Sequence, residues 1–188
     1  NILKNNQPVG VTLSIMDYQA AEGGEKVRDQ AYAESVDCCL DQITNDDFVG
    51  VQMYTRHTYG PDGIIKPKAD DPNMLVMGYE YYPESLENVV RYVSSKIKTP
   101  IMITENGIGT DDDNQRIQYL TTALQGLQKC LDDGIDVRGY FCWSLLDNFE
   151  WLFGYKPRFG LVEVNRETLN RQAKESFKFF KGVIDQSS

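Results

Sequence analysis

The sequence is poor in the residues that build metal centres and disulfide frameworks. It contains a single histidine, His57, and four cysteines, which are Cys38, Cys39, Cys130 and Cys142. None of the cysteines belongs to a Cys-x-x-Cys pair, so the spacing typical of zinc sites is missing. We therefore expect no metal ion and interpret the cysteines as buried free thiols. Unpaired thiols fit a reducing compartment and favour a cytoplasmic location.

Long apolar runs and clusters of basic residues are missing as well. No stretch approaches the roughly 18 consecutive apolar residues of a membrane span. The 19 lysine and arginine residues are scattered among 28 aspartate and glutamate residues, and the formal net charge is -9. This balance disfavours nucleic-acid and anionic-membrane partners. The chain starts at Asn1 with no charged-then-apolar leader, so no signal peptide is visible, but a start other than methionine hints at an upstream segment.

The length limits the fold, although the composition is that of a folded domain. The 188 residues are 41% hydrophobic and 25% charged, which supplies enough apolar material for a sizeable core. A complete eight-stranded β/α barrel needs roughly 200 residues at the least and typically about 250. We therefore expect one ordinary domain or part of a larger one.

Hydrophobic patterns alternate between strand and helix along the whole chain. Short β-rich runs predict strands, and apolar residues at helical spacing predict a helix after each of them. The predicted strands span 9–15, 47–54, 100–104 and 137–145, and the helices span 25–43, 83–97, about 113–133 and about 172–184. Two long loops cover 56–82 and 147–171, the second with a short strand-like run at 160–164. Residues 1–188 thus form a single α/β region of four βα units, for which a parallel sheet is expected.

Functional groups of parallel β/α folds lie at the carboxyl ends of the strands. Glu105 directly follows the apolar strand at 100–104, where a carboxylate is held rigidly and partly desolvated. Such a group suits a nucleophile or an acid/base catalyst, or else it caps the loop. Gln52 and Tyr54 end the strand at 47–54 and supply hydrogen-bonding groups, which are alternatively structural.

Both tryptophans of the chain flank a carboxylate after the fourth predicted strand. The segment from Trp143 to Trp151 contains Glu150. Aromatic faces stack on sugar rings and carboxylates accept hydrogen bonds from sugar hydroxyls, whereas either tryptophan alone would equally fill a core. The pattern therefore indicates a carbohydrate site without proving one.

These segments together resemble family 1 of the glycoside hydrolases, the β-glucosidase family. Residues 103–107 (ITENG) and 143–151 (WSLLDNFEW) are similar to two of its signatures, and 158–160 (RFG) follows at the expected distance. Residues 47–54 (DFVGVQMY) resemble the segment of its sixth strand. The similarity covers nearly the whole chain in the family's order. It implies the C-terminal half, strands five to eight, of a TIM (β/α)8 barrel, with the N-terminal half absent.

The resemblance also implies roles for individual residues. Glu105 matches the catalytic nucleophile, and Tyr54 matches a tyrosine that donates a hydrogen bond to it. The substrate-binding positions that it implies are Gln52, Trp143, Glu150, Trp151 and Phe159. Relatives acting on 6-phosphorylated sugars usually carry serine at the position of Glu150, so a carboxylate there favours an unmodified β-glycoside. Gln52 replaces a common asparagine, and Tyr79 a usual tryptophan, which leaves the sugar preference open.

The resemblance implies a retaining mechanism, which needs two carboxyl groups about 5–5.5 Å apart. The family's acid/base glutamate lies in an Asn-Glu-Pro motif, and this motif is missing from the sequence. We therefore expect the chain to work with an N-terminal half that is separate or cleaved. The alternative is a non-catalytic half-barrel module that binds sugar or self-associates. No cofactor is expected, because 107–109 (GIG) lacks the third glycine and the following helix of a dinucleotide fingerprint.

Overall fold

The computed structural model describes residues 7–68 and 70–187. The predicted single region of 1–188 therefore includes a few residues, 1–6, 69 and 188, that lie outside this description. Within it, the main sheet has four strands, all parallel, in the order β1-β3-β6-β7. These strands are β1 (Gly10–Ser14), β3 (Phe48–Met53), β6 (Ile101–Asn106) and β7 (Val137–Cys142). They confirm the four predicted strands and their parallel arrangement.

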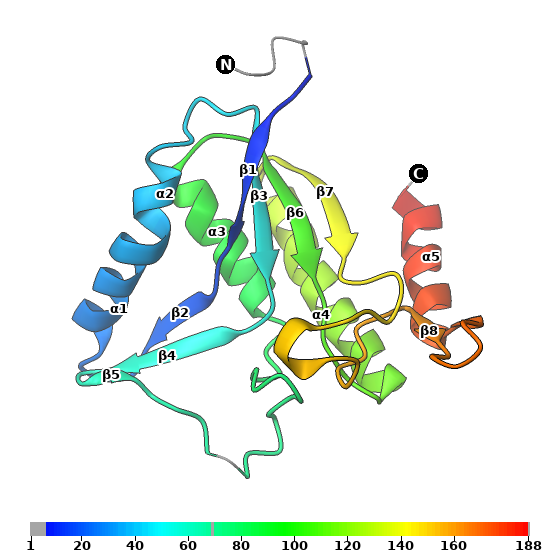
Figure 1. Cartoon of the computed structure of the whole chain (residues 1–188). Helices are drawn as coiled ribbons and strands as arrows, with labels where there is room; N and C mark the ends of the chain where they lie inside the picture. Colours follow the sequence, from blue (N-terminus) through cyan, green and yellow to red (C-terminus); the bar gives the residue numbers. More distant parts are fainter. Residues whose placement is uncertain (1–6, 69, 188) are drawn as a thin grey trace.

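Helices follow each strand and cover one side of the sheet (Figure 1). They are α1 (Glu25–Tyr32), the π-helical η1 (Ala33–Asp37), α2 (Cys38–Leu40), α3 (Ser85–Lys96), α4 (Asp113–Asp132) and α5 (Glu175–Ser187). Strand order along the sheet follows chain order, as it does in a β/α barrel. The fold is therefore a partial barrel of four βα units.

The hydrophobic core lies between the sheet and the helices. Val49, Val51 and Ile103 alternate toward the helices and are fully buried, together with Leu86 and Val89 of α3. Burying each such side chain stabilises the fold by about 1.5–3 kcal/mol before the entropy of ordering is counted. The core thus fixes the position of β3 and β6, the two strands that carry the predicted catalytic groups.

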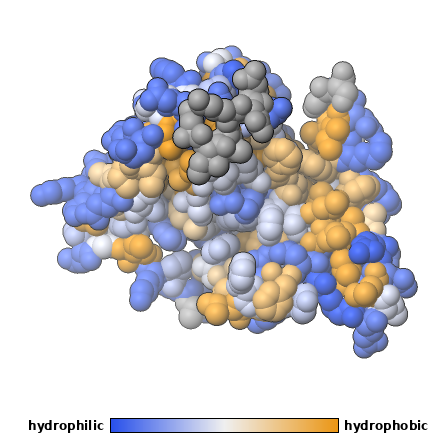
Figure 2. All heavy atoms as spheres, turned by 45° about the horizontal axis from the view of Figure 1, so that its top comes forward, coloured by the Kyte–Doolittle hydropathy of each residue, from blue (hydrophilic) through white to orange (hydrophobic). Residues whose placement is uncertain are grey.

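The opposite face of the sheet carries small and polar side chains. Gly50 faces Thr12 and Thr104, and a Cβ at Gly50 would lie 2.3 Å from Oγ1 of Thr12. At the β7 edge, Phe141 is 57% exposed. Hydrophobic surface is concentrated on the side of the molecule where α5 lies (Figure 2). Layers of side chains from further strands fill this face in a closed barrel.

The three short strands of a second sheet were not predicted. β2 (Asp17–Ala20) pairs in parallel with β4 (Arg56–Gly60), which turns back through β5 (Gly63–Ile64). The prediction of a long loop over 56–82 was therefore wrong for its first residues, which form β4 and β5. These strands are short and polar and extend from the ends of β1 and β3, so no apolar alternation reveals them.

Several element boundaries also differ from the sequence prediction. The first helical segment ends at Leu40 rather than residue 43, and η1 interrupts it. The fourth strand ends at Cys142, while the third continues to Asn106. The last helix begins at Glu175, because the preceding residues form β9 (Arg171–Ala173), which pairs with β8 (Val162–Val164). Tertiary pairing, which local patterns do not contain, decides each of these ends.

The prediction that all four thiols are buried was wrong. The four cysteines are free, but only Cys130 is buried, while Cys38 is exposed and Cys39 and Cys142 are partly exposed. Cys38 lies just after the π-helical turn on a face of the helix that no other element covers. Among the helices that the structure describes, none is long and apolar enough to cross a bilayer.

Candidate active site

Glu105 lies at the carboxyl end of β6 and faces the end of β3. The register between these strands shifts by one residue, so that Val51 is opposite Ile103 whereas Gln52 is opposite Glu105. Such a bulge redirects the side chains that follow it. Glu105 thus lies within β6, at its last residue but one. The predicted strand ended one residue earlier, at 104.

Two side chains of the neighbouring strand hold the carboxylate of Glu105. Nε2 of Gln52 donates to Oε1 at 2.5 Å, and the hydroxyl of Tyr54 donates to Oε2 at 2.5 Å. Hydrogen bonds to a charged acceptor are short and strong. Burial, followed by the hydrogen bond to Glu105, raises the pKa of Tyr54 well above its usual range. The phenol therefore keeps its proton and remains a donor.

A buried polar cluster fixes the two strand ends behind this pair. The side chain of Asn106 is fully buried and donates to the carbonyl of Met53 at 2.8 Å and to the hydroxyl of Tyr119 at 3.0 Å. Its oxygen accepts a hydrogen bond from Tyr140 at 2.8 Å. The hydroxyl of Tyr119 in turn donates to the carbonyl of Tyr54 at 3.1 Å. Because all these groups are satisfied, the cluster locks the backbone on both sides of Glu105.

A second carboxylate, Glu150, lies in the loop after β7. Its Oε1 accepts hydrogen bonds from Nε1 of Trp143 at 3.2 Å and from Nδ2 of Asn148 at 2.6 Å. Glu150 is buried, and its charge contributes to the raised pKa of Tyr54. The loop therefore brings Glu150 and Trp143 together close to the Tyr54–Glu105 pair.

The two remaining aromatic residues predicted for the site differ in exposure. Phe159 is 2% exposed and packs edge-on against Tyr54, with ring centroids 6.0 Å apart. Phe159 thus supports the ring of Tyr54, and its predicted role in lining the sugar pocket stays a prediction. Trp151 is 84% exposed at the tip of the loop. A sugar-contacting role for Trp151 also stays a prediction, since its indole points to solvent.

The loop before α3 adds a further aromatic ring to this region. Tyr79 lies against Tyr54 with ring centroids 6.1 Å apart. Its neighbour Glu80 forms a two-point ion pair with Arg56, through contacts of 2.6 and 2.9 Å. The guanidinium also lies 3.9 Å from the ring centroid of Tyr82. These contacts tie the loop to β4 and hold Tyr79 beside the site.

Sequence reasoning missed the residues that support the site. Asn106 and Asn148 both lie within the recognised motifs; Asn106 bonds to Tyr119 of α4, whereas Asn148 bonds to Glu150 of its own loop. Tyr119 and Tyr140 lie in ordinary apolar patterns of α4 and β7, and only the three-dimensional fold shows their hydroxyl contacts. Among the described residues, no group of three or more metal-ligating side chains gathers at one place.

Comparison with known proteins identifies the family of the chain. The model of glycosyl hydrolase family 1 matches residues 34–188. The chain belongs to this family. It is 41% identical over 126 residues to the bifunctional β-D-glucosidase/β-D-fucosidase of Bifidobacterium breve, which covers 60% of this chain and 27% of the relative. It is 36% identical over 152 residues to β-glucosidase A of Thermotoga maritima, covering 73% of this chain and 34% of the relative.

Solved family 1 structures agree with the partial barrel. A β-glycosidase crystal structure superposes with a TM-score of 0.90 at 44% identity, covering 98% of this chain and 44% of that chain. The chain thus spans about a third or less of the two curated relatives above and under half of this solved structure. Membership in glycosyl hydrolase family 1 and the partial TIM-barrel fold are confirmed.

Proposed function

We propose that this chain supplies the nucleophile and much of the sugar pocket of a retaining β-glycosidase. The observation that carries the proposal is the geometry of Glu105, whose two carboxylate oxygens each accept one short hydrogen bond, from Gln52 and from Tyr54. These bonds fix the orientation of the carboxylate at the carboxyl end of a barrel strand. Each oxygen retains a lone pair, so the group is oriented but not blocked.

The reaction would proceed in two displacements. In the first, a carboxylate oxygen of Glu105 bonds to the anomeric carbon of the sugar while the bond to the aglycone oxygen breaks. The leaving oxygen takes a proton from a separate carboxylic acid. In the second, water attacks the same carbon after the conjugate base removes its proton, and Glu105 leaves as a carboxylate. Two inversions give net retention of configuration.

Tyr54 and Gln52 would act through Glu105 in both steps. A hydrogen bond from a neutral phenol or amide stabilises the carboxylate before attack and after release. Because each oxygen accepts one of the two bonds, the oxygen that does not attack is held in either case, which limits rotation about the last side-chain torsion. Holding the nucleophile in the orientation of attack lowers the barrier by proximity and alignment.

The acid/base group would come from a further segment of polypeptide. Asn-Glu-Pro, which carries this glutamate in the family, does not occur in the sequence. Glu150 is already bound by Trp143 and Asn148 in a manner that suits recognition of sugar hydroxyls. We therefore assign Glu150 to binding, and propose a complementary N-terminal half of the barrel as the partner that brings the acid.

The proposed substrate is an unmodified terminal β-glycoside. A carboxylate at position 150 would repel the phosphate of a 6-phosphorylated sugar. The two curated relatives above are named for glucoside and fucoside hydrolysis, and we propose β-D-glucosides or related β-glycosides for this chain. The cytoplasmic location inferred from the cysteines stays a proposal.

The direct test is hydrolysis of an aryl β-glucoside by the chain, alone and mixed with a family 1 N-terminal half that contains Asn-Glu-Pro. We expect turnover only in the mixture, and we expect Glu105→Gln to reduce it by several orders of magnitude. Full turnover by the chain alone would contradict dependence on a partner. Turnover that survives Glu105→Gln would contradict the assignment of the nucleophile.

The uncovered face of the sheet also fits the alternative of a non-catalytic module. The face of the sheet away from the helices leaves Phe141 57% exposed beside the open β7 edge. A second copy of the chain would cover this face as well as a complementary half would. The mass of the purified assembly separates the two: a homodimer without turnover supports the module, and a companion chain with Asn-Glu-Pro supports the enzyme.

A further inference from the structure

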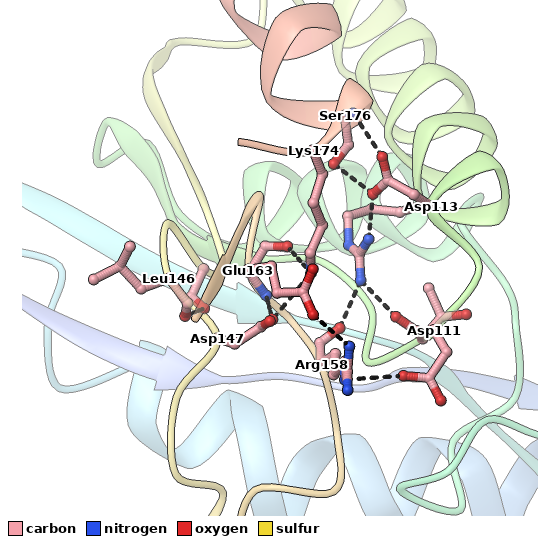
Figure 3. Close-up of polar contacts among 12 residues, drawn as sticks. Asp111, Asp113, Leu146, Asp147, Arg158, Glu163, Lys174 and Ser176 are labelled. Carbon is pink, nitrogen blue, oxygen red and sulfur yellow. Dashed lines mark hydrogen bonds and ion pairs between the residues drawn. The ribbon is translucent and has the colours of Figure 1, made fainter. Parts of the chain in front are cut away.

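The loop that carries Glu150 is closed at its base by a buried ion pair. Nζ of Lys174 donates to Oδ1 of Asp147 at 3.0 Å and to the carbonyl of Gly160 at 2.7 Å. The same Oδ1 accepts the backbone N–H of Gly160 at 2.9 Å. The side chains of Lys174 and Asp147 are only 14% and 6% exposed. Figure 3 shows Lys174 reaching from the start of α5 toward Asp147.

This pair joins the outgoing and the returning arm of the loop. Main-chain hydrogen bonds already link the arms from Ser144 to Phe159 and from Leu161 to Ser144. Asp147 lies at the point where the arms separate, and everything between 148 and 159 extends beyond it. A Cβ at Gly160 would lie 2.2 Å from the backbone nitrogen of Asp147, so the two arms touch there. The base of the loop is therefore a single closely packed layer.

Beyond this base, the turn around Glu150 is held by contacts within its own loop and by Trp143, which follows β7. Its internal bonds are local, such as the one from the N–H of Glu150 to the carbonyl of Gly154 at 2.7 Å. The tip residues Trp151 and Leu152 are 84% and 98% exposed. The position of the Glu150 carboxylate relative to Glu105 therefore depends on its bond to Trp143 and on how the base of the loop is held.

Neighbouring charges anchor the base to two helices. Arg116 of α4 is buried and donates to the carbonyl of Arg158 in the returning arm at 2.6 Å. Arg116 pairs with Asp113, which also accepts hydrogen bonds from the backbone and hydroxyl of Ser176 at the start of α5. Two cations and two carboxylates thus connect α4, α5 and the loop (Figure 3).

A buried ion pair is weak evidence for stability, because desolvation offsets much of the attraction. A buried ion pair is better explained as a contact that selects one conformation of the chain over others. We infer that Lys174, acting through Asp147, is a positioning residue that sets the direction of the loop 148–159 and so presents Glu150 to the sugar. The part of this inference that concerns the sugar rests on the proposed function, whereas the part that concerns the loop does not.

The test uses Lys174→Met, which keeps the length of the side chain and removes its charge. Asp147→Asn combined with Lys174→Met removes both charges, so no buried carboxylate is left without its cation. Lys174→Arg restores a cation. The matched control is Lys178→Met in the following helix α5, since Lys178 forms an exposed ion pair with Glu175 at 2.6 Å.

The first readout is tryptophan fluorescence of the chain itself, and it does not require activity. In a Trp151→Phe background, Trp143 is the remaining tryptophan, and its indole is bonded to Glu150. Well below the unfolding transition, with folding checked by circular dichroism, Lys174→Met and the double variant should shift the Trp143 emission to longer wavelength and increase its quenching by acrylamide. Lys178→Met should change neither the emission nor the quenching. Lys174→Arg should show an emission and a quenching close to those of the wild type.

The second readout is the kinetics of the chain paired with its complementary half. Loss of positioning at Glu150 should raise KM by about tenfold and change kcat much less, because binding to the sugar is lost while Glu105 stays in place. Unchanged Trp143 emission and unchanged KM in folded Lys174→Met would overturn the inference. If both charge-removing variants fail to fold while Lys178→Met folds, the pair is a folding determinant and the positioning role is rejected. If the paired wild type shows no turnover, the proposed function fails, and the fluorescence alone decides this inference.

Discussion

The hydroxyl of Tyr54 donates a 2.5 Å hydrogen bond to Oε2 of Glu105, although the two residues are 51 positions apart in the sequence. They meet because β3 and β6 are adjacent parallel strands whose carboxyl ends lie at the same edge of the sheet. The phenol keeps its proton, since burial and the neighbouring carboxylate raise its pKa. This contact is the part of the site that most directly supports a catalytic carboxylate.

Removing this hydroxyl should reduce turnover without unfolding the chain. Tyr54→Phe leaves the ring packed against Phe159 and removes one donor from Oε2. A hydrogen bond to a charged group contributes about 1.5–3 kcal/mol, so kcat/KM of the paired enzyme should fall roughly 10- to 150-fold. Steady-state kinetics with an aryl β-glucoside checks this. Tyr59→Phe, in the second sheet, is the control and should leave kcat/KM unchanged.

The buried cluster behind the site should contribute to stability. Tyr119→Phe removes the hydroxyl that accepts from Asn106 and donates to the carbonyl of Tyr54. Both partners then remain buried without this bond, and the free energy of unfolding should fall by about 1–3 kcal/mol. Urea unfolding followed by circular dichroism measures the change. If Tyr119→Phe lowers the free energy of unfolding no more than Tyr59→Phe does, the hydrogen bonds of the cluster do not stabilise the fold.

Two glycine positions should respond to alanine in opposite ways. A Cβ at Gly160 would lie 2.2 Å from the nitrogen of Asp147 and 2.6 Å from the oxygen of Val162, and these backbone atoms cannot both move away. Gly160→Ala should therefore destabilise the chain by about 3 kcal/mol or more. A Cβ at Gly182 in α5 meets nothing within 4 Å, so Gly182→Ala should stabilise it by about 0.5–1 kcal/mol. Thermal and urea unfolding of the two variants test the pair, and equal effects would contradict the packing of the loop base.

Asp113 should make stability depend on pH in the acidic range. Burial raises the pKa of this carboxyl, but hydrogen bonds from Ser176 and Arg116 outweigh it and hold the pKa below its ordinary value of 3.8. A lowered pKa in the folded state means that its stabilising contribution is complete above pH 3.8 and is lost as the pH falls through the lower folded-state value. The difference in unfolding free energy between wild type and Asp113→Asn should be about 1 kcal/mol at pH 6 and shrink toward pH 3. A difference that stays constant over this range would contradict the lowered pKa.

The sequence was enough to predict the sheet and the central pair of the site. Apolar runs marked all four strands of the main sheet, and the carboxyl ends of β3 and β6 carried Tyr54 and Glu105. The resemblance to the family implied a hydrogen bond between these residues, and the structure brings them into hydrogen-bond contact. The family model and the solved structures confirm the partial barrel.

Other features depend on contacts that no local pattern contains. β2 and β4 are polar and pair with each other outside the main sheet, so hydrophobic alternation does not reveal them. Lys174 looks like an ordinary residue before a helix, and only the fold places it beside Asp147. Trp151 and Phe159 look equivalent in the motifs, but one is exposed at a loop tip and the other is buried under Tyr54.

In the proposed mechanism, Glu105 forms a covalent bond with the sugar. The most direct measurement treats the chain, paired with its complementary half, with a 2-deoxy-2-fluoro-β-glucoside that carries a good leaving group. Such a sugar is attacked by the nucleophile but is released slowly. We predict a mass increase of one fluorohexosyl unit that peptide mapping places on Glu105, and no increase in Glu105→Gln. A label on Glu150 or on any other carboxylate, or turnover of the parent glucoside retained by Glu105→Gln, would contradict it.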